Sequence, residues 1–345
     1  MNLVTSRRLR HMAILLVATG PGLAGCGDST SGANAEAGAD PGVRDDAGVS
    51  GKGPSDADLG SDTDRPAQSP DGAASADAAG PPPGTPLRFV VFGDSRDNPT
   101  VHQSVVDAIA AKAPQLILDT GDLWAGYPSG SSQWKTITTK NATVADLLSK
   151  NLYLVSRGNH ESVSELLAFQ PSLVRGNKET YSFTFGSGFF VSLGMDPAAA
   201  TAFLEAELKT PAAQAAKWRM VYSHYPIYSG GPHGGTGDAA IEKLCDTYHV
   251  AVYFNGHDHT YERSHQMFGQ KIADKGDALS LAKGTVYVVS GGGGAPFYAV
   301  TPIASTHTYK TNKNHFVLVT ANDAKLTVEA LDTTGATLDT FSVAQ

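Results

Sequence analysis

Cysteine, long apolar runs and net charge outside one acidic segment are all scarce in this sequence. The 345 residues include two cysteines, and the apolar run at 13–18 is too short to span a bilayer as a permanent helix. Residues 27–86 contain almost no large apolar side chain, so burial cannot offset the entropy of ordering them. This segment also holds eleven acidic residues against three basic ones, which leaves 87–345 nearly neutral. We therefore expect no nucleic-acid binding.

The N-terminus has the features of an export signal. Three arginines within 7–10 precede the short apolar run, and Leu23-Ala24-Gly25-Cys26 resembles the lipobox of bacterial lipoproteins. The resemblance implies a signal peptide at 1–25, a lipid on the sulfur of Cys26, and a flexible tether over 26–86. The protein would then be anchored to a membrane on the extracytoplasmic side, at the periplasmic face or the cell surface. The alternative is an ordinary secretory signal with a chance cysteine.

Lipidation of Cys26 would leave no partner for an intrachain disulfide. The remaining cysteine, Cys245, lies in an amphipathic helical pattern and is predicted to be a small buried residue.

The region 87–345 is predicted to be a single layered α/β domain. Helical spacing of apolar residues predicts helices at 100–112, 198–209 and 239–248. A further helical region is expected to end at residue 150. A hairpin is expected at 181–193, and three strands at the end of the chain, 315–343. Apolar runs predict further strands at 87–92, 115–118, 152–155, 219–222, 250–254 and 286–289. Strands that alternate with helices and then continue alone favour layers of sheets and helices. The sequence gives no indication of oligomeric state.

Polar side chains that can bind metal follow five of these strands. In α/β proteins, sites gather at the carboxyl ends of strands, so we expect these side chains to meet. His257 and His259 can point into one cleft only if the chain bends between strand and motif, and Gly256 would permit that bend. Carboxylate, amide and imidazole ligands together suit Fe, Mn or Zn better than Ca. The candidates are Asp94, Asp122, Asn159, His224, His257 and His259.

These motifs resemble those of the calcineurin-like metallophosphoesterases. The matching segments are Gly93-Asp94, Gly121-Asp122, Gly158 to Glu161, Val221 to His224 and Gly256 to His259. Within that family, the segment 256–263 and the pair His224-Tyr225 followed by His233 are similar to the purple acid phosphatase branch. The resemblance implies a four-layer αββα sandwich of two mixed sheets, with two transition metal ions at its edge.

The resemblance also implies a role for each residue. Asp94, Asp122 and His259 would hold metal one, and Asp122 would bridge to metal two. Asn159, His224 and His257 would complete metal two. His160 and His233 would face the substrate phosphate, with His160 as the acid for the leaving oxygen or a stabiliser of the transition state. A hydroxide bridging the metals would attack phosphorus.

Two positions depart from the family pattern. Arg96 stands where many relatives have a histidine, and Ala125 stands where purple phosphatases have a tyrosine. Metal one would then have only three protein ligands, and Tyr127 has the wrong spacing to replace the tyrosine. Arg96 would contact the phosphate, since a guanidinium suits it, or else pair with a local aspartate.

Other residues have alternative roles. Trp124, Tyr127 and Tyr228 would line the cleft or simply pack. Asp119 would support a histidine, cap a helix or be exposed to solvent, while Glu161 and Glu262 would orient their neighbours. The glycine run 291–294 lacks a following Lys-Ser/Thr and is not a P-loop; a flexible loop beside the site is favoured over a phosphate cradle.

The sequence therefore predicts hydrolysis of phosphate esters, with monoesters favoured. A phosphodiesterase acting on nucleotides or lipid head groups would use the same metals. A lipoprotein that kept the fold for binding without turnover is the alternative from another class, supported by Arg96 and Ala125 alone.

Overall fold

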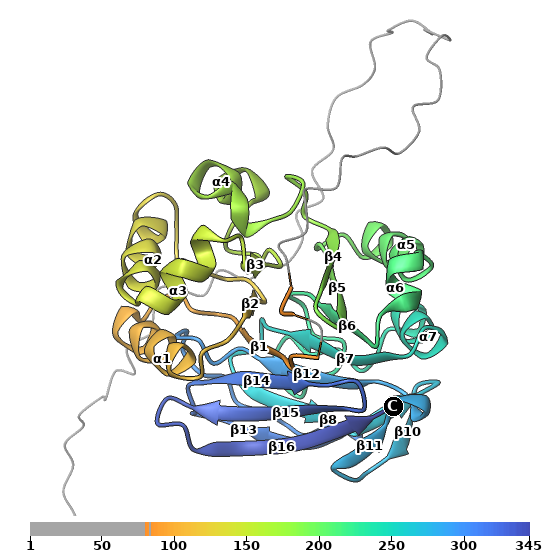
Figure 1. Ribbon diagram of the computed structural model, residues 1–345. Coiled ribbons are helices and arrows are strands. Elements are labelled where there is room, and N and C mark those ends of the chain that lie inside the picture. The colour runs from red at the N-terminus through yellow and green to blue at the C-terminus, as the bar shows by residue number, and fades with distance from the viewer. Residues whose placement is uncertain (1–79, 83) are drawn as a thin grey trace, which may run out of the picture. The chain divides into compact units, whose positions relative to one another are not determined.

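The protein is described by a computed structural model that covers residues 80–82 and 84–345 (Figure 1). The predicted signal peptide, the lipidation site Cys26 and most of the tether lie outside the described residues. Two seven-stranded mixed sheets form the centre of the described part of the chain. No helix within that part is long and apolar enough to cross a membrane.

Each sheet combines strands from several parts of the sequence. In spatial order, the first sheet contains β11 (Ala278–Ser280), β16 (Thr337–Ala344), β15 (Lys325–Asp332), β14 (His315–Ala321), β1 (Leu87–Phe92), β2 (Leu116–Asp119) and β3 (Tyr153–Val155). The second contains β13 (Thr306–Lys310), β8 (Tyr261–Ser264), β12 (Val286–Ser290), β7 (Val250–Asn255), β6 (Trp218–Tyr222), β5 (Gly188–Ser192) and β4 (Tyr181–Phe185). A separate hairpin pairs β9 (Gln266–Phe268) with β10 (Lys271–Asp274).

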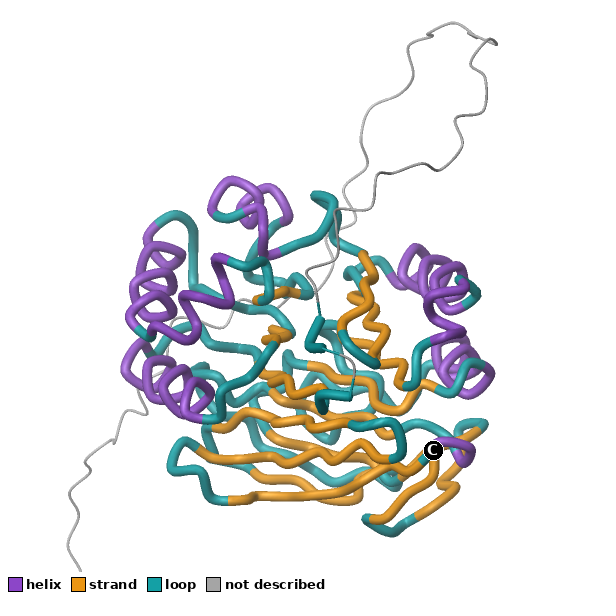
Figure 2. The backbone as a smooth tube through the Cα atoms, in the orientation of Figure 1, coloured by secondary structure: helices purple, strands orange, loops and turns teal. Residues whose placement is uncertain are grey.

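Helices lie in two groups on opposite sides of the sheets (Figure 2). One group contains α1 (Pro99–Ala111), α2 (Ser129–Lys140), α3 (Ala142–Ser149) and α4 (Val163–Phe169), and the other contains α5 (Pro197–Leu208), α6 (Pro211–Ala215) and α7 (Ala239–Thr247). Capping explains where α1 begins: Asn98 accepts a hydrogen bond from the Val101 N–H, and Pro99 occupies the first turn. The two groups and two sheets form the predicted four layers.

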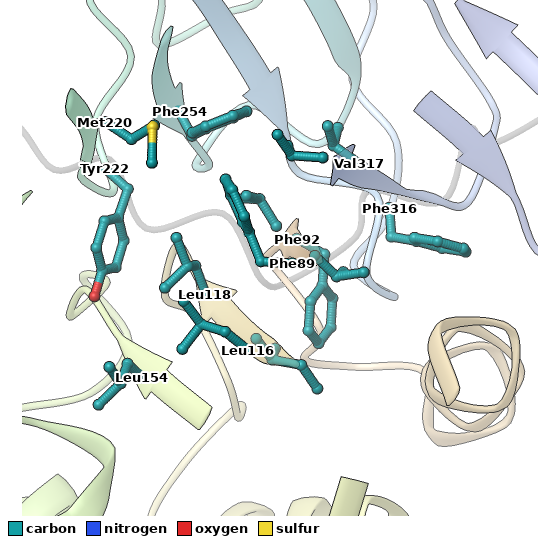
Figure 3. Close-up of a cluster of buried hydrophobic side chains, with 14 of the residues drawn as sticks. Phe89, Phe92, Leu116, Leu118, Leu154, Met220, Tyr222, Phe254, Phe316 and Val317 are labelled. Carbon is teal, nitrogen blue, oxygen red and sulfur yellow. The ribbon is translucent and has the colours of Figure 1, made fainter. Parts of the chain in front are cut away.

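Aromatic and aliphatic side chains from both sheets form the core between them (Figure 3). Phe89 of β1 lies edge-on to Phe190 and Phe254 of the second sheet, with ring centroids 5.2 and 6.3 Å away. Full burial of such a side chain stabilises the fold by about 1.5–3 kcal/mol. This contact holds the two sheets face to face.

Parallel pairing aligns the strand ends that carry the site. Phe92 of β1 pairs with Asp119 of β2, which in turn pairs with Val155 of β3. In the second sheet, Tyr222 of β6 pairs with Phe254 of β7. The chain therefore leaves these strands at matching heights, and the polar segments that follow them meet at one edge of the sandwich.

The predicted mixed α/β architecture is confirmed, including the three terminal strands β14 to β16. The sequence reasoning missed α4, α6, β8 to β11 and β13. Two of these strands bury polar residues, Glu262 and Arg263 in β8 and Gln266 in β9, in place of an apolar alternation. Cys245 is buried on α7, as predicted.

Candidate metal centre

Strained backbone places three of the predicted ligands. Asp94, Asp122 and His257 have positive φ values of 57°, 58° and 70°, a backbone region that residues other than glycine rarely adopt. The bend expected at Gly256 is therefore made by His257 itself. Gly256 serves close packing instead, because a Cβ there would lie 2.6 Å from the Asp94 Oδ2. The prediction about Gly256 was wrong because the close approach of another strand end cannot be read locally.

The donors assigned to metal two converge on one point. His224 Nε2 lies 2.8 Å from Asn159 Oδ1, 3.0 Å from His257 Nδ1 and 3.4 Å from Asp122 Oδ1. The other ring nitrogen of His224 lies 2.8 Å from the Thr120 carbonyl and donates its hydrogen there. Nε2 therefore presents a lone pair toward the amide and carboxylate oxygens. Acceptors held this close need a shared cation, so these residues fit a metal ion.

The donors assigned to metal one form a second group that shares Asp122. The ligand atoms of Asp94, Asp122 and His259 all lie within 4.8 Å of one another, as do those of Asp122, His224 and His257. His259 Nδ1 lies 2.5 Å from the Pro296 carbonyl, which leaves Nε2 facing Asp94 Oδ1 at 3.7 Å. The structure therefore brings all six predicted ligands to one edge, with Asp122 between the two groups.

Burial raises the pKa of both aspartates, but the neighbouring charges shift the two pKa values in different directions. Burial and the Asp122 carboxylate raise the pKa of Asp94 well above its ordinary value. Burial also raises the pKa of Asp122, but His224, His160 and Arg96 together bring it below its ordinary value. Two buried carboxylates this close require nearby positive charge.

Burial keeps the histidine ligands neutral. It is the main cause that lowers the pKa of His257 to about 3 and that of His259 to about 4, and it lowers the pKa of His224 as well. Neutral imidazole is the form that binds a metal ion. The histidine ligands are thus in the required form at neutral pH.

The profile of the calcineurin-like phosphoesterase family matches residues 87–261, which include all six side chains. The chain belongs to the calcineurin-like phosphoesterase family. It is 26% identical to a nucleotide pyrophosphatase/phosphodiesterase of Hordeum vulgare over 74% of this chain and 82% of that protein. It is 29% identical to purple acid phosphatase 21 of Arabidopsis thaliana over 62% of this chain, and it spans 51% of that relative's length.

Solved structures show the same fold. Purple acid phosphatase PPD1 from yellow lupin, Lupinus luteus, superposes with a TM-score of 0.62 at 19% identity, covering 79% of this chain and 55% of that chain. Family membership and the purple acid phosphatase relatives support a phosphoester hydrolase, and the family depends on two metal ions. The two donor groups of this phosphoesterase agree with that requirement.

Two partly exposed histidines border the metal donors of the phosphoesterase. The His160 side chain is 38% exposed, its backbone N–H donates to Asp122 Oδ1, and its Nε2 lies 3.8 Å from Asp122 Oδ2. The His233 side chain is 42% exposed, and its ring centroid lies 4.4 Å from that of His257. Both residues are where a phosphate held at the metals could reach them.

Asp258, which sequence reasoning did not assign, fixes His233. Its Oδ1 accepts from the backbone N–H of His233 and lies 3.1 Å from His233 Nδ1, while its Oδ2 accepts from Ser229 Oγ at 2.6 Å. Asp258 is fully buried between the two ligands His257 and His259. Its position between two metal-binding histidines is the sequence signal that could have revealed this role.

Glu161 supports the metal centre through hydrogen bonds to the backbone. Its carboxylate accepts from the backbone N–H groups of Asp122, Leu123 and Gly158, which ties two strand-end loops together. Burial and the Asp122 charge raise the pKa of Glu161 to about 8, while these three donors favour its ionised form. The expectation that Glu161 orients its neighbours agrees with these bonds.

The contacts of Glu262 and Asp119 resolve two other assignments. Glu262 Oε1 lies 2.7 Å from Ser229 Oγ and its Oε2 accepts from the Gly230 N–H, and so Glu262 also orients its neighbours. Asp119 accepts from Tyr153 and the Gly121 N–H rather than supporting a histidine or capping a helix.

The aromatic residues mostly pack. Tyr228 is buried and donates to Glu242, so it does not face the metal donors. Tyr127 is 40% exposed, packs against Trp124 and lies outside both donor groups. Trp124 is buried, but it also lines a cavity of about 360 Å³ together with Arg96 and Ala125. Of these three aromatic residues, Trp124 alone keeps the expected role of lining a cleft beside the site.

The glycine run lies beside the site, as expected, but it is packed tightly. Residues 291–294 are buried, and the Gly293 N–H donates to the Gly93 carbonyl at 2.9 Å. A Cβ at Gly291 would lie 2.2 Å from the Asp258 carbonyl oxygen. Glycine is thus needed here for close approach to the Asp94 loop, in place of the expected flexibility.

Proposed function

We propose that this phosphoesterase hydrolyses phosphate monoesters at a centre of two transition metals. The observation that carries the proposal is the pair of donor groups that share Asp122, bordered by the partly exposed His160 and His233. Asp94, Asp122 and His259 would hold metal one, and Asp122, Asn159, His224 and His257 would hold metal two. When bound, two such ions activate water and polarise phosphoryl oxygens; Fe, Mn or Zn suits the donor set.

The protein's own residues would complete the reaction. His160 and His233 would donate hydrogen bonds to the phosphate, where charge accumulates in the transition state. His160 would give a proton to the leaving oxygen, since its ring is partly exposed and borders the centre. Asp258 would hold the ring of His233 in one orientation through Nδ1.

The deciding experiment measures metal content and turnover together. The full-length protein, purified without chelator, would be analysed for metal and assayed with an aryl phosphate after addition of Mn, Zn or Fe. We expect metal-dependent turnover that is lost in His257→Ala and Asp122→Ala. Absence of both bound metal and turnover would instead favour the binding lipoprotein without catalysis.

Phosphodiesters are the second candidate substrate class. Two cavities adjoin the centre: the one of about 360 Å³ includes Arg96, and another of about 210 Å³ includes His224 and Tyr225. Two recesses could receive the two arms of a diester, and the barley relative is named a nucleotide pyrophosphatase/phosphodiesterase. Faster turnover of a bis-aryl phosphate than of the aryl monoester would favour this class.

We also propose that the protein is a lipoprotein anchored through Cys26. The support is the order of basic segment, short apolar run and Leu23-Ala24-Gly25-Cys26. Metabolic labelling with a radioactive fatty acid should mark the wild-type chain and leave Cys26→Ser unlabelled. Equal labelling of both would contradict the anchor.

A further inference from the structure

A guanidinium group already lies among the ligands assigned to metal one. Arg96 Nε donates to Asp122 Oδ2 at 3.2 Å, and Arg96 Nη2 lies 3.5 Å from His259 Nε2. Its Nη1 pairs with Asp97, and its side chain is only 15% exposed. Two of the three donors of metal one therefore already contact a fixed positive charge.

The charge balance explains this placement. Asp94 and Asp122 are fully buried, and two adjacent carboxylates without a cation would repel each other. Arg96 supplies one positive charge at this point, and an arginine cannot lose its proton at any ordinary pH. Arg96 reaches the donors of metal two through the shared Asp122, whereas His224 Nε2, Asn159 Oδ1 and His257 Nδ1 face one another.

The two metal sites must therefore differ in affinity. A divalent ion at metal two meets lone pairs that already converge. To hold a divalent ion at metal one, Asp122 and His259 would have to give up their contacts with Arg96, next to a like charge that is shielded from water. A histidine at this position would add a ligand, whereas the arginine adds repulsion.

We propose that Arg96 acts as a built-in cation at metal one, so that the protein binds one metal tightly at metal two and a second one weakly. The proposal rests on the dimetal centre described under the proposed function. It makes the occupancy of metal one depend on the concentration of free metal, and it assigns that dependence to a single side chain.

The test is a calorimetric titration of metal into chelator-treated, full-length protein, with Zn²⁺ as the probe. Wild type should bind one equivalent tightly and a second at least about tenfold more weakly, a difference of about 1.4 kcal/mol. Arg96→Gln should tighten the second event at least about tenfold, and Arg96→Lys should leave it weak because the charge remains. Asp94→Ala should remove the weak event and spare the tight one.

Arg88→Gln is the matched control. Arg88 lies on β1, the strand that leads to Arg96. Its Nε donates to the Lys112 carbonyl, away from the metal donors. It should leave both events unchanged. Two equal events in wild type, or an unchanged second event in a folded Arg96→Gln variant, would overturn the proposal.

Turnover measured on the same samples separates the two proposals. Unequal binding that Arg96→Gln abolishes, without turnover at any metal loading, would support the role of Arg96 and overturn the hydrolase. Equal binding with turnover would do the reverse.

Discussion

Acid sensitivity should arise in part from His102, a buried histidine on α1 outside the metal centre. Its side chain packs between Phe92 and Trp134, with ring centroids 6.4 and 6.5 Å away, and its Nε2 has no hydrogen-bond partner among the described residues. Burial lowers its pKa from 6.5 to about 3. Replacement by leucine would keep an apolar side chain there and remove the titrating group.

The sign follows from proton linkage. Between pH 6.5 and about 3, the unfolded chain binds a proton at His102 and the folded chain does not. Stability from this residue is therefore complete above pH 6.5 and is lost as the pH falls. The slope is about 1.4 kcal/mol per pH unit, which amounts to roughly 2 kcal/mol at pH 5.

Urea unfolding at pH 7.5 and pH 5.0 would measure the effect. The wild-type chain should lose about 2 kcal/mol more on acidification than His102→Leu does. Ile109→Val, a change on the same buried face of α1, is the matched control: it should cost about 1 kcal/mol equally at both pH values. If His102→Leu loses as much stability as wild type on acidification, the reasoning is refuted.

Three further predictions concern the residues that support the centre. Glu161→Ala should lower the free energy of unfolding by roughly 3 kcal/mol or more, because three buried N–H groups lose their acceptor; urea unfolding would check this, and a loss below about 1 kcal/mol would contradict it. Gly158→Ala should reduce metal content in elemental analysis, because a Cβ there would lie 2.2 Å from Asp122 Oδ1; full metal content would argue against this contact. Asp258→Asn should lower kcat roughly tenfold or more with metal content unchanged, since His233 loses the carboxylate that orients it. Unchanged steady-state kinetics in that variant would remove His233 orientation from the mechanism.

The sequence by itself determined the features that depend on local order along the chain. Apolar runs followed by Asp94, Asp122 and His224 predicted both the strands and the edge where they end, because parallel strands present their carboxyl ends together. The three terminal strands were also predictable, because their alternation of apolar and polar residues and their turns are local features of the sequence. The donor set also pointed to transition metals, because ligand chemistry depends on residue type alone.

Only the tertiary structure decided what the charged side chains contact. Arg96 could be paired with Asp122 and His259 only after strands far apart in sequence had met, and the same holds for Asp258 and His233. Arg263 gives a further case: it is buried and paired with Asp339 and Asp277, which come from distant segments. The energy of a charge depends on its distance from others and on its exposure to water, and both are set by packing.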